Sequence, residues 1–175
     1  MPEQPVRCRF KISGAVQGVG FRPFVFNLAA KYCLGGRVYN DAKGVVIDVE
    51  GDAERVAGFD RELETGPPPP ARIDRIIKKV LPVQGCREFF IELNSAGAAG
   101  DIPLPPDLAV CPVCRKELAD PGDRRFRYSF INCTACGPRL TIVESLPYDR
   151  CRTSMKAFPM CPECGREYAD PLNRR

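Results

Sequence analysis

Hydrophobic and polar residues alternate along residues 6–13, as in a strand with one buried face. After a glycine-rich loop, apolar residues recur at helical spacing over residues 21–32. Pro23 falls in the first turn of that segment, where a helix tolerates proline. The pattern therefore predicts a strand followed by an amphipathic helix.

The segments from residue 37 to residue 93 also have patterns that predict strands and a helix. Residues 37–40 and 45–50 are two extended segments joined by a short polar turn, which predicts a hairpin. Residues 53–64 carry an apolar stripe at helical spacing, and a glycine followed by four prolines ends that helix. Residues 72–81 and 88–93 again have the character of strands. The order βαββαβ is the split-βαβ or ferredoxin-like arrangement, so we predict an α+β fold.

The periodicity stops after this unit. Residues 1–93 are predicted to form one domain, and the alanine-, glycine- and proline-rich residues 94–106 are predicted to be a linker. Within residues 107–175, fifteen residues starting at position 111 reappear fifty positions later, from 161 to 175. A match of this length indicates that the module was duplicated.

Composition narrows the possible chemistry. The chain has 175 residues, ten cysteines, no histidine and a formal net charge of +4. The lack of histidine excludes histidine general bases, Ser/His or Cys/His nucleophile pairs, and Cys/His zinc sites. The near-neutral charge argues against a nucleic-acid-binding arm. Since no apolar run approaches the ~20 residues of a membrane span and the start carries charges, we expect a cytoplasmic protein without membrane contact.

The loop between the first strand and the first helix has the features of an anion site. Residues 14–22 read GAVQGVGFR. Unpaired backbone N–H groups and the helix dipole favour an anion there, and Arg22 could add a forked contact to phosphate oxygens. Taken alone, the same residues would also fit a tight turn with a surface arginine.

The cysteines of the second half predict a metal site. Cys111 and Cys114 form one C-x-x-C pair, and Cys133 and Cys136 form another after 18 intervening residues. This spacing is typical of a structural four-cysteine zinc site, with chance thiols or disulfides as the alternative. The repeat places a third pair at Cys161 and Cys164, which is half of a second zinc site. Because its expected partners would lie beyond residue 175, we expect the chain to be a fragment of a longer polypeptide.

The loop resembles that of the acylphosphatase family at every fixed position of G-x-V-Q-G-V-x-F-R. Residues 36–46, GRVYNDAKGVV, resemble the second motif of that family, although Arg37 stands where an aromatic residue is usual. The resemblance implies that Asn40 positions the attacking water and that the loop binds phosphate. The implied phosphate-binding residues are Gln17, Gly18, Val19, Gly20, Phe21 and Arg22.

An acylphosphatase domain followed by duplicated C-x-x-C modules resembles the N-terminal part of the HypF-type hydrogenase-maturation carbamoyltransferases. The resemblance spans nearly the whole chain and includes residues 130–139, FINCTACGPR, and 146–150, LPYDR. It implies cleavage of carbamoyl phosphate, with structural zinc. It also implies later domains on the same polypeptide, and a maturation partner protein that accepts the carbamoyl group on the way to the cyanide ligands of a nickel–iron hydrogenase.

Two other interpretations remain. Charged and aromatic residues interleave at Arg124, Arg125, Arg127, Tyr128 and Phe130, as in a zinc ribbon that binds RNA or DNA. Alternatively, the ferredoxin-like domain is not catalytic and the whole chain is a scaffold. For residues 94–175, a role as a scaffold that docks later domains is the interpretation that we favour.

Overall fold

The computed structural model describes residues 4–92, 107–146 and 148–175. The first domain, residues 4–92, has its elements in the predicted order βαββαβ, with an α+β fold. Their bounds are β1 (Pro5–Ala15), α1 (Phe21–Lys31), β2 (Gly35–Asp41), β3 (Gly44–Asp52), α2 (Ala53–Thr65), β4 (Arg72–Leu81) and β5 (Phe89–Ile91). The predicted linker, 94–106, and the end of the last predicted strand at residue 93 lie outside the described residues.

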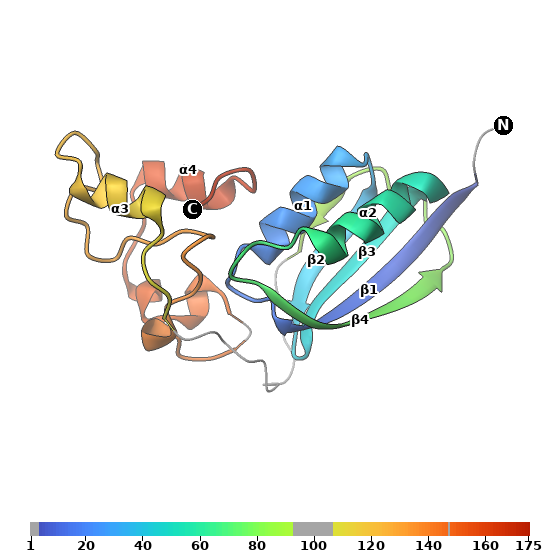
Figure 1. The fold of residues 1–175 in the computed structure, drawn as a ribbon, viewed down its shortest axis with the longest axis horizontal. Coiled ribbons are helices and arrows are strands. Elements are labelled where there is room, and N and C mark those ends of the chain that lie inside the picture. The colour runs from blue at the N-terminus through green and yellow to red at the C-terminus, as the bar shows by residue number, and fades with distance from the viewer. Residues whose placement is uncertain (1–3, 93–106, 147) are drawn as a thin grey trace.

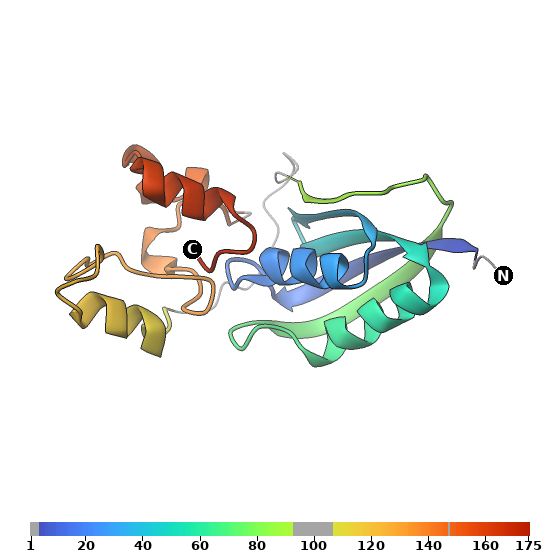
Figure 2. The same cartoon turned by 90° about the horizontal axis from the view of Figure 1, so that it is seen from above.

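One mixed sheet forms the base of the first domain. Its strand order is β4-β1-β3-β2-β5, and every neighbouring pair is antiparallel except β2 and β5. Both helices cover the same face of this sheet (Figures 1 and 2). The core between them contains the inward residues of β1 and β3, among them Phe10 and Ile47, which face each other across the two strands.

A glycine in the middle of α2 has a packing reason. A Cβ atom at Gly58 would lie 2.4 Å from Cε1 of Tyr32, at the end of α1. Glycine normally weakens a helix interior, but here it allows the two helices to approach closely. The sequence alone showed only the cost of this residue.

The opposite face of the sheet carries a network of charges. Asp48 accepts hydrogen bonds from Arg9 at 2.6 and 2.8 Å, from Arg7 at 3.2 Å and from Arg37 at 3.4 Å. Burial would raise the pKa of Asp48, but the hydrogen bonds and charges of these arginines lower it below its ordinary value. Glu50, next on this face, accepts from three backbone N–H groups of residues 84–86 and so fixes the connection from β4 to β5.

The cysteine-rich region, residues 107–175, lies beyond the N-terminal end of α1 (Figure 1). It consists of short helices and turns, and in its described residues one isolated bridge joins Val143 to Thr153. Its elements are α3 (Pro112–Ala119), η1 (Leu140–Ile142), η2 (Arg150–Arg152), η3 (Ser154–Ala157) and α4 (Pro162–Ala169). Within the described ranges, no helix is long and apolar enough to cross a membrane.

Candidate active site and metal centre

The loop between β1 and α1 holds its amides at the start of a helix. Gly18 and Gly20 have φ angles of 71° and 74°, which L residues with a side chain rarely adopt. Gly20 is the N-cap of α1, and as a glycine it supplies no side-chain cap of its own. The helix N-terminus therefore keeps the polarity that attracts an anion.

Arg22 lies in the first turn of α1 and lines a cavity of about 910 Å³. Burial lowers the pKa of Arg22, while the nearby charge of Asp149 acts against this shift. A guanidinium remains charged under all ordinary conditions, so Arg22 contributes a positive charge to the wall of the cavity. Gly18 and Gly20 line the same cavity, which places the predicted phosphate loop on its wall.

Asn40 is completely buried in β2, where it pairs with Val45 of β3. Neither its side-chain nitrogen nor its side-chain oxygen has a hydrogen-bond partner among the described residues. A buried amide in this state costs about 1–3 kcal/mol for each unmet group. Such a cost is expected where a side chain is kept for a polar ligand.

Gln17 joins the loop to the hairpin that carries Asn40. Its side-chain nitrogen donates to the carbonyl oxygens of Asp41 at 3.0 Å and Gly44 at 2.8 Å, at the turn between β2 and β3. Its side-chain oxygen accepts from the backbone N–H of Tyr148 at 3.1 Å. These bonds engage Gln17 in holding the loop, so its side chain positions the site.

Val19 and Phe21 also belong to the predicted loop, and their side chains are fully buried in the core of the first domain. Only their backbone groups could therefore face an anion. The apolar side chains anchor the loop, and the glycines between them shape it.

The cysteine-rich region covers this loop, which the sequence did not predict. A Cβ atom at Gly18 would lie 2.8 Å from Cβ of Pro138 and 2.9 Å from Cδ1 of Tyr148. A Cβ atom at Gly20 would lie 2.6 Å from Cβ of Thr134. The two glycines are thus required by close packing as well as by their φ angles.

Two more residues of this region stand beside Arg22. The hydroxyl of Tyr168 donates to Oδ1 of Asp149 at 3.0 Å. Burial and the charge of Asp149 raise the pKa of Tyr168 to about 12, so the hydroxyl stays protonated and remains a donor at neutral pH. The only sequence signal for either residue is the LPYDR segment that contains Asp149.

The four predicted zinc ligands do come together. The sulfur atoms of Cys111, Cys114, Cys133 and Cys136 all lie within 4.8 Å of one another. Cys133 Sγ is 3.7 Å from the sulfur atoms of both Cys111 and Cys136. A tetrahedral site with Zn–S bonds of about 2.3 Å has sulfur atoms about 3.8 Å apart, so this donor set fits zinc.

The surroundings of these sulfur atoms favour a thiolate at Cys111 and disfavour one at Cys133. Cys111 is the N-cap of α3, and its sulfur accepts from the backbone N–H of Cys114 at 3.5 Å. Although burial acts in the other direction, this bond and the other thiols lower the pKa of Cys111 to about 6. Burial raises the pKa of Cys133 to about 12. A metal ion must displace the remaining protons, so its affinity falls in acid.

Cys161 and Cys164 reproduce half of this arrangement. Cys161 is the N-cap of α4, and its sulfur accepts from the backbone N–H of Cys164 at 3.5 Å. Within the described parts of the chain, only the first four cysteines form a cluster of three or more metal ligands. The second zinc site therefore stays a prediction.

Comparisons with known proteins agree with this geometry. Residues 8–91 match the acylphosphatase family and residues 110–143 match the HypF finger. The acylphosphatase of Chlorobaculum tepidum is 36% identical over 86 residues, which cover 49% of this chain and 94% of that protein. The chain therefore belongs to the acylphosphatase family through its first domain, and it carries a match to the HypF finger after that domain.

The similarity to HypF proteins extends along almost the whole chain. The carbamoyltransferase HypF of Rhodobacter capsulatus is 47% identical over 168 residues, which cover 95% of this chain and 22% of that protein. A crystal structure of full-length HypF in the phosphate- and nucleotide-bound form superposes with a TM-score of 0.92 and 49% identity, covering 100% of this chain and 23% of that one. The chain thus spans about a fifth of the length of these relatives.

Proposed function

We propose that the first domain hydrolyses acyl phosphates, with carbamoyl phosphate as its substrate. The observation that carries this proposal is the buried amide of Asn40, which has no hydrogen-bond partner among the described residues and stands in a strand whose following turn is bonded to the loop before Arg22. Gln17 bridges the two elements, because its side chain belongs to the loop and bonds to the turn that follows Asn40. The proposed site therefore combines an anion-binding loop with a polar side chain on a hairpin to which that loop is bonded.

The proposed reaction needs only positioning and charge stabilisation. The loop amides and Arg22 hold the phosphate, and the side chain of Asn40 orients a water molecule toward phosphorus. The bond from phosphorus to the acyl oxygen breaks, and carbamate and inorganic phosphate are released. An acyl phosphate has a good leaving group, so a site without histidine can carry out this step.

The wider role that we propose follows the relatives. Hydrolysis of carbamoyl phosphate would be the first step of carbamoyl transfer in the maturation of nickel–iron hydrogenase. Later domains of the same polypeptide and a carbamoyl-accepting maturation protein would be the partners. Zinc at the four cysteines of the finger would have a structural role. Because free thiol ligands persist in a reducing compartment, we propose that the protein acts in the cytoplasm.

The nucleic-acid alternative is less well supported by the structure. Arg124 and Arg125, which would contact phosphates, both form ion pairs with Glu167. Tyr128 and Phe130 are exposed and pack edge to face, with ring centroids 6.0 Å apart. Of the three arginines in this stretch, only Arg127 has no ion pair among the described residues, so little unpaired positive charge accompanies the exposed rings for an anionic strand.

The proposal is tested by phosphate release from carbamoyl phosphate and from acetyl phosphate. Asn40→Ala should lower kcat by about 100-fold with little change in KM, because the amide acts on the water. Arg22→Ala should raise KM and lower kcat, because its charge meets the phosphate before and during the reaction.

The matched controls are Asn27→Ala and Arg61→Ala, which alter exposed residues of α1 and α2. Both should keep near-full activity. The site assignment is wrong if Arg22→Ala or Asn40→Ala, shown folded by circular dichroism, is as active as these controls. Hydrolysis of acetyl phosphate but not of carbamoyl phosphate would refute the substrate while leaving the site intact.

A further inference from the structure

The duplicated segments, called here the first repeat (111–125) and the second repeat (161–175), each end in two arginines. In neither case do these arginines contact the cysteines of their own repeat in the described structure. Arg124 and Arg125 of the first repeat reach the second, where both pair with Glu167. Arg124 also donates to Sγ of Cys164 at 3.4 Å.

The second repeat makes equivalent ion pairs with the first, and both of its arginines, rather than one, reach a sulfur atom. Arg174 and Arg175 both pair with Glu117. Each also donates from Nη1 to Sγ of Cys114, at 3.2 Å in both cases. Glu117 and Cys114 are the equivalents of Glu167 and Cys164, fifty positions apart, so the exchange is reciprocal.

The helix at the start of each repeat explains why one arginine pair can contact both a cysteine and a glutamate of that repeat. Cys114 and Glu117 are three residues apart in α3, which places their side chains on the same face. The arginine fork spans a thiolate and a carboxylate on that face. The side chain of Arg175 is 10% exposed, so this contact is shielded from solvent and salt.

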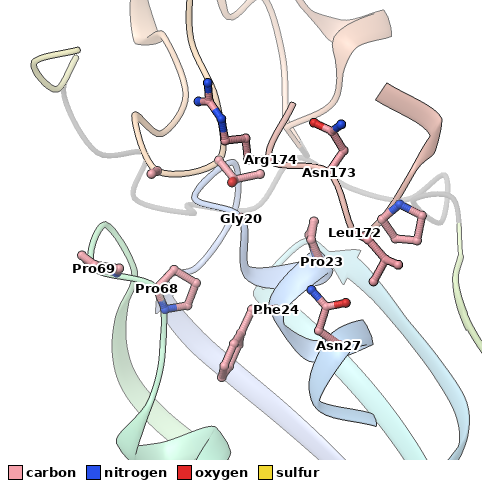
Figure 3. A pocket seen from close by; sticks show the side chains of 12 residues that line it. Gly20, Pro23, Phe24, Asn27, Pro68, Pro69, Leu172, Asn173 and Arg174 are labelled. Carbon is pink, nitrogen blue, oxygen red and sulfur yellow. The ribbon is translucent and has the colours of Figure 1, made fainter. Parts of the chain in front are cut away.

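The backbone adds a second link on the other side of the zinc site. The backbone N–H of Thr134, between the ligands Cys133 and Cys136, donates to the carbonyl oxygen of Arg174 at 2.8 Å. Thr134 is also the residue that packs on Gly20 of the phosphate loop. Figure 3 shows Gly20 and Arg174 lining one pocket of about 330 Å³ between α1 and the end of the second repeat.

We propose that the arginine pair of each repeat is an outer donor to the zinc thiolates of the other repeat. Arg174 and Arg175 hold the Cys111–Cys136 site, and Arg124 and Arg125 hold the site that Cys161 and Cys164 begin. A zinc ion with four thiolates has a net charge of −2, which two guanidinium groups offset. Groups that hydrogen-bond to metal ligands change metal affinity by about 10–100-fold. The duplication thus yields one reciprocal unit rather than two independent fingers.

The test compares two double variants that remove identical charges from equivalent positions. Arg174→Ala/Arg175→Ala should release the zinc held by Cys111, Cys114, Cys133 and Cys136 to a chelator about 10–100-fold faster than the unchanged chain. Arg124→Ala/Arg125→Ala should change that rate by no more than about threefold, even though these arginines lie between the ligands in sequence.

Replacing zinc with cobalt gives an absorption spectrum that reports on the sulfur ligands themselves, so a change in packing alone should not alter it. The thiolate-to-cobalt charge-transfer band should shift in Arg174→Ala/Arg175→Ala and stay in place in Arg124→Ala/Arg125→Ala, because only the first change removes donors to Cys114. If the double alanine variant does not fold, Arg175→Lys serves instead, since it keeps the charge and loses the fork. Its release rate should then be faster than that of the exposed control Arg166→Lys.

Equal effects of the two arginine pairs on zinc release would overturn the proposal, because general docking of the repeats would then explain them. Unchanged release and an unchanged cobalt spectrum in Arg174→Ala/Arg175→Ala would also overturn it. The proposal is supported if zinc release is faster in Arg174→Ala/Arg175→Ala but not in Arg124→Ala/Arg125→Ala, and if the cobalt band shifts in the first variant alone.

Discussion

Zinc binding is expected to decide whether residues 107–145 are folded. Apart from the four cysteines, Ile131 is the one buried apolar side chain that the described structure places in the hydrophobic cluster of this region. Burial of one such side chain contributes about 1.5–3 kcal/mol. Zinc binding in small zinc domains contributes about 10–16 kcal/mol at neutral pH. The metal therefore outweighs apolar burial several-fold.

Cys133→Ser is the perturbation that tests this estimate. Elemental analysis of the reduced wild-type chain should find about one tightly bound zinc, with any further zinc at Cys161 and Cys164 easily chelated. Cys133→Ser should lose the tight zinc, and limited proteolysis should then cut within residues 107–145. Cys151→Ser, at an exposed cysteine outside the cluster, should lose neither zinc nor protection.

Hydrolysis of acyl phosphate should largely survive the same change. The buried core of the first domain and the apolar residues packed on it all lie between residues 6 and 91. Arg22 and Asn40 stand on elements of that core. The reasoning is refuted if reduced wild-type protein holds no tight zinc, if Cys133→Ser keeps it, or if hydrolysis collapses when zinc is removed.

Two further predictions concern the first domain. A chain that ends at residue 95 should fold cooperatively in a thermal melt followed by circular dichroism and should hydrolyse acetyl phosphate; an unfolded or inactive product would show that the two regions share a core. Asp48→Asn should lower the free energy of unfolding at pH 7 by about 3–5 kcal/mol, because three arginines lose a common buried charge partner. Because the pKa of Asp48 is lowered in the folded state, its contribution to stability is present above about pH 4 and is lost as the pH falls through the folded value. In urea titrations, the difference in free energy of unfolding between wild type and Asp48→Asn should therefore be smaller at pH 2 than at pH 7.

The fold of the first domain could be predicted because its periodic patterns are unambiguous. The predicted strand 72–81 has the observed bounds of β4, and the predicted helix 53–64 ends one residue before α2 does. Alternation over β1 and spacing over α1 reflect burial against one face of one sheet, which is a local property of the sequence. The four-cysteine cluster could be predicted for a similar reason, since ligand spacing follows from the chemistry of one ion.

Contacts between distant segments could not be predicted in this way. The sequence indicated that Gly18 and Gly20 shape an anion loop, but it did not show that Pro138, Tyr148 and Thr134 pack on them. It revealed the duplication, yet nothing in either repeat says which repeat its arginines will face. Those choices depend on how the repeats pack in space, and many packings are compatible with the same pattern.

The separate cores and the shared surroundings of the phosphate loop have different consequences. Folding free energy resides in two clusters without a common buried residue, which is why we expect either part to survive loss of the other. Access to Arg22 is determined jointly, because the cavity in front of it is walled by residues of both parts, including Tyr148 and Tyr168. Under the proposed function, the loop would therefore hold the phosphate while the cysteine-rich region supplies the wall beside the acyl group. The place to look for preference among acyl groups is that wall, since a phosphate-binding loop contacts what all acyl phosphates have in common.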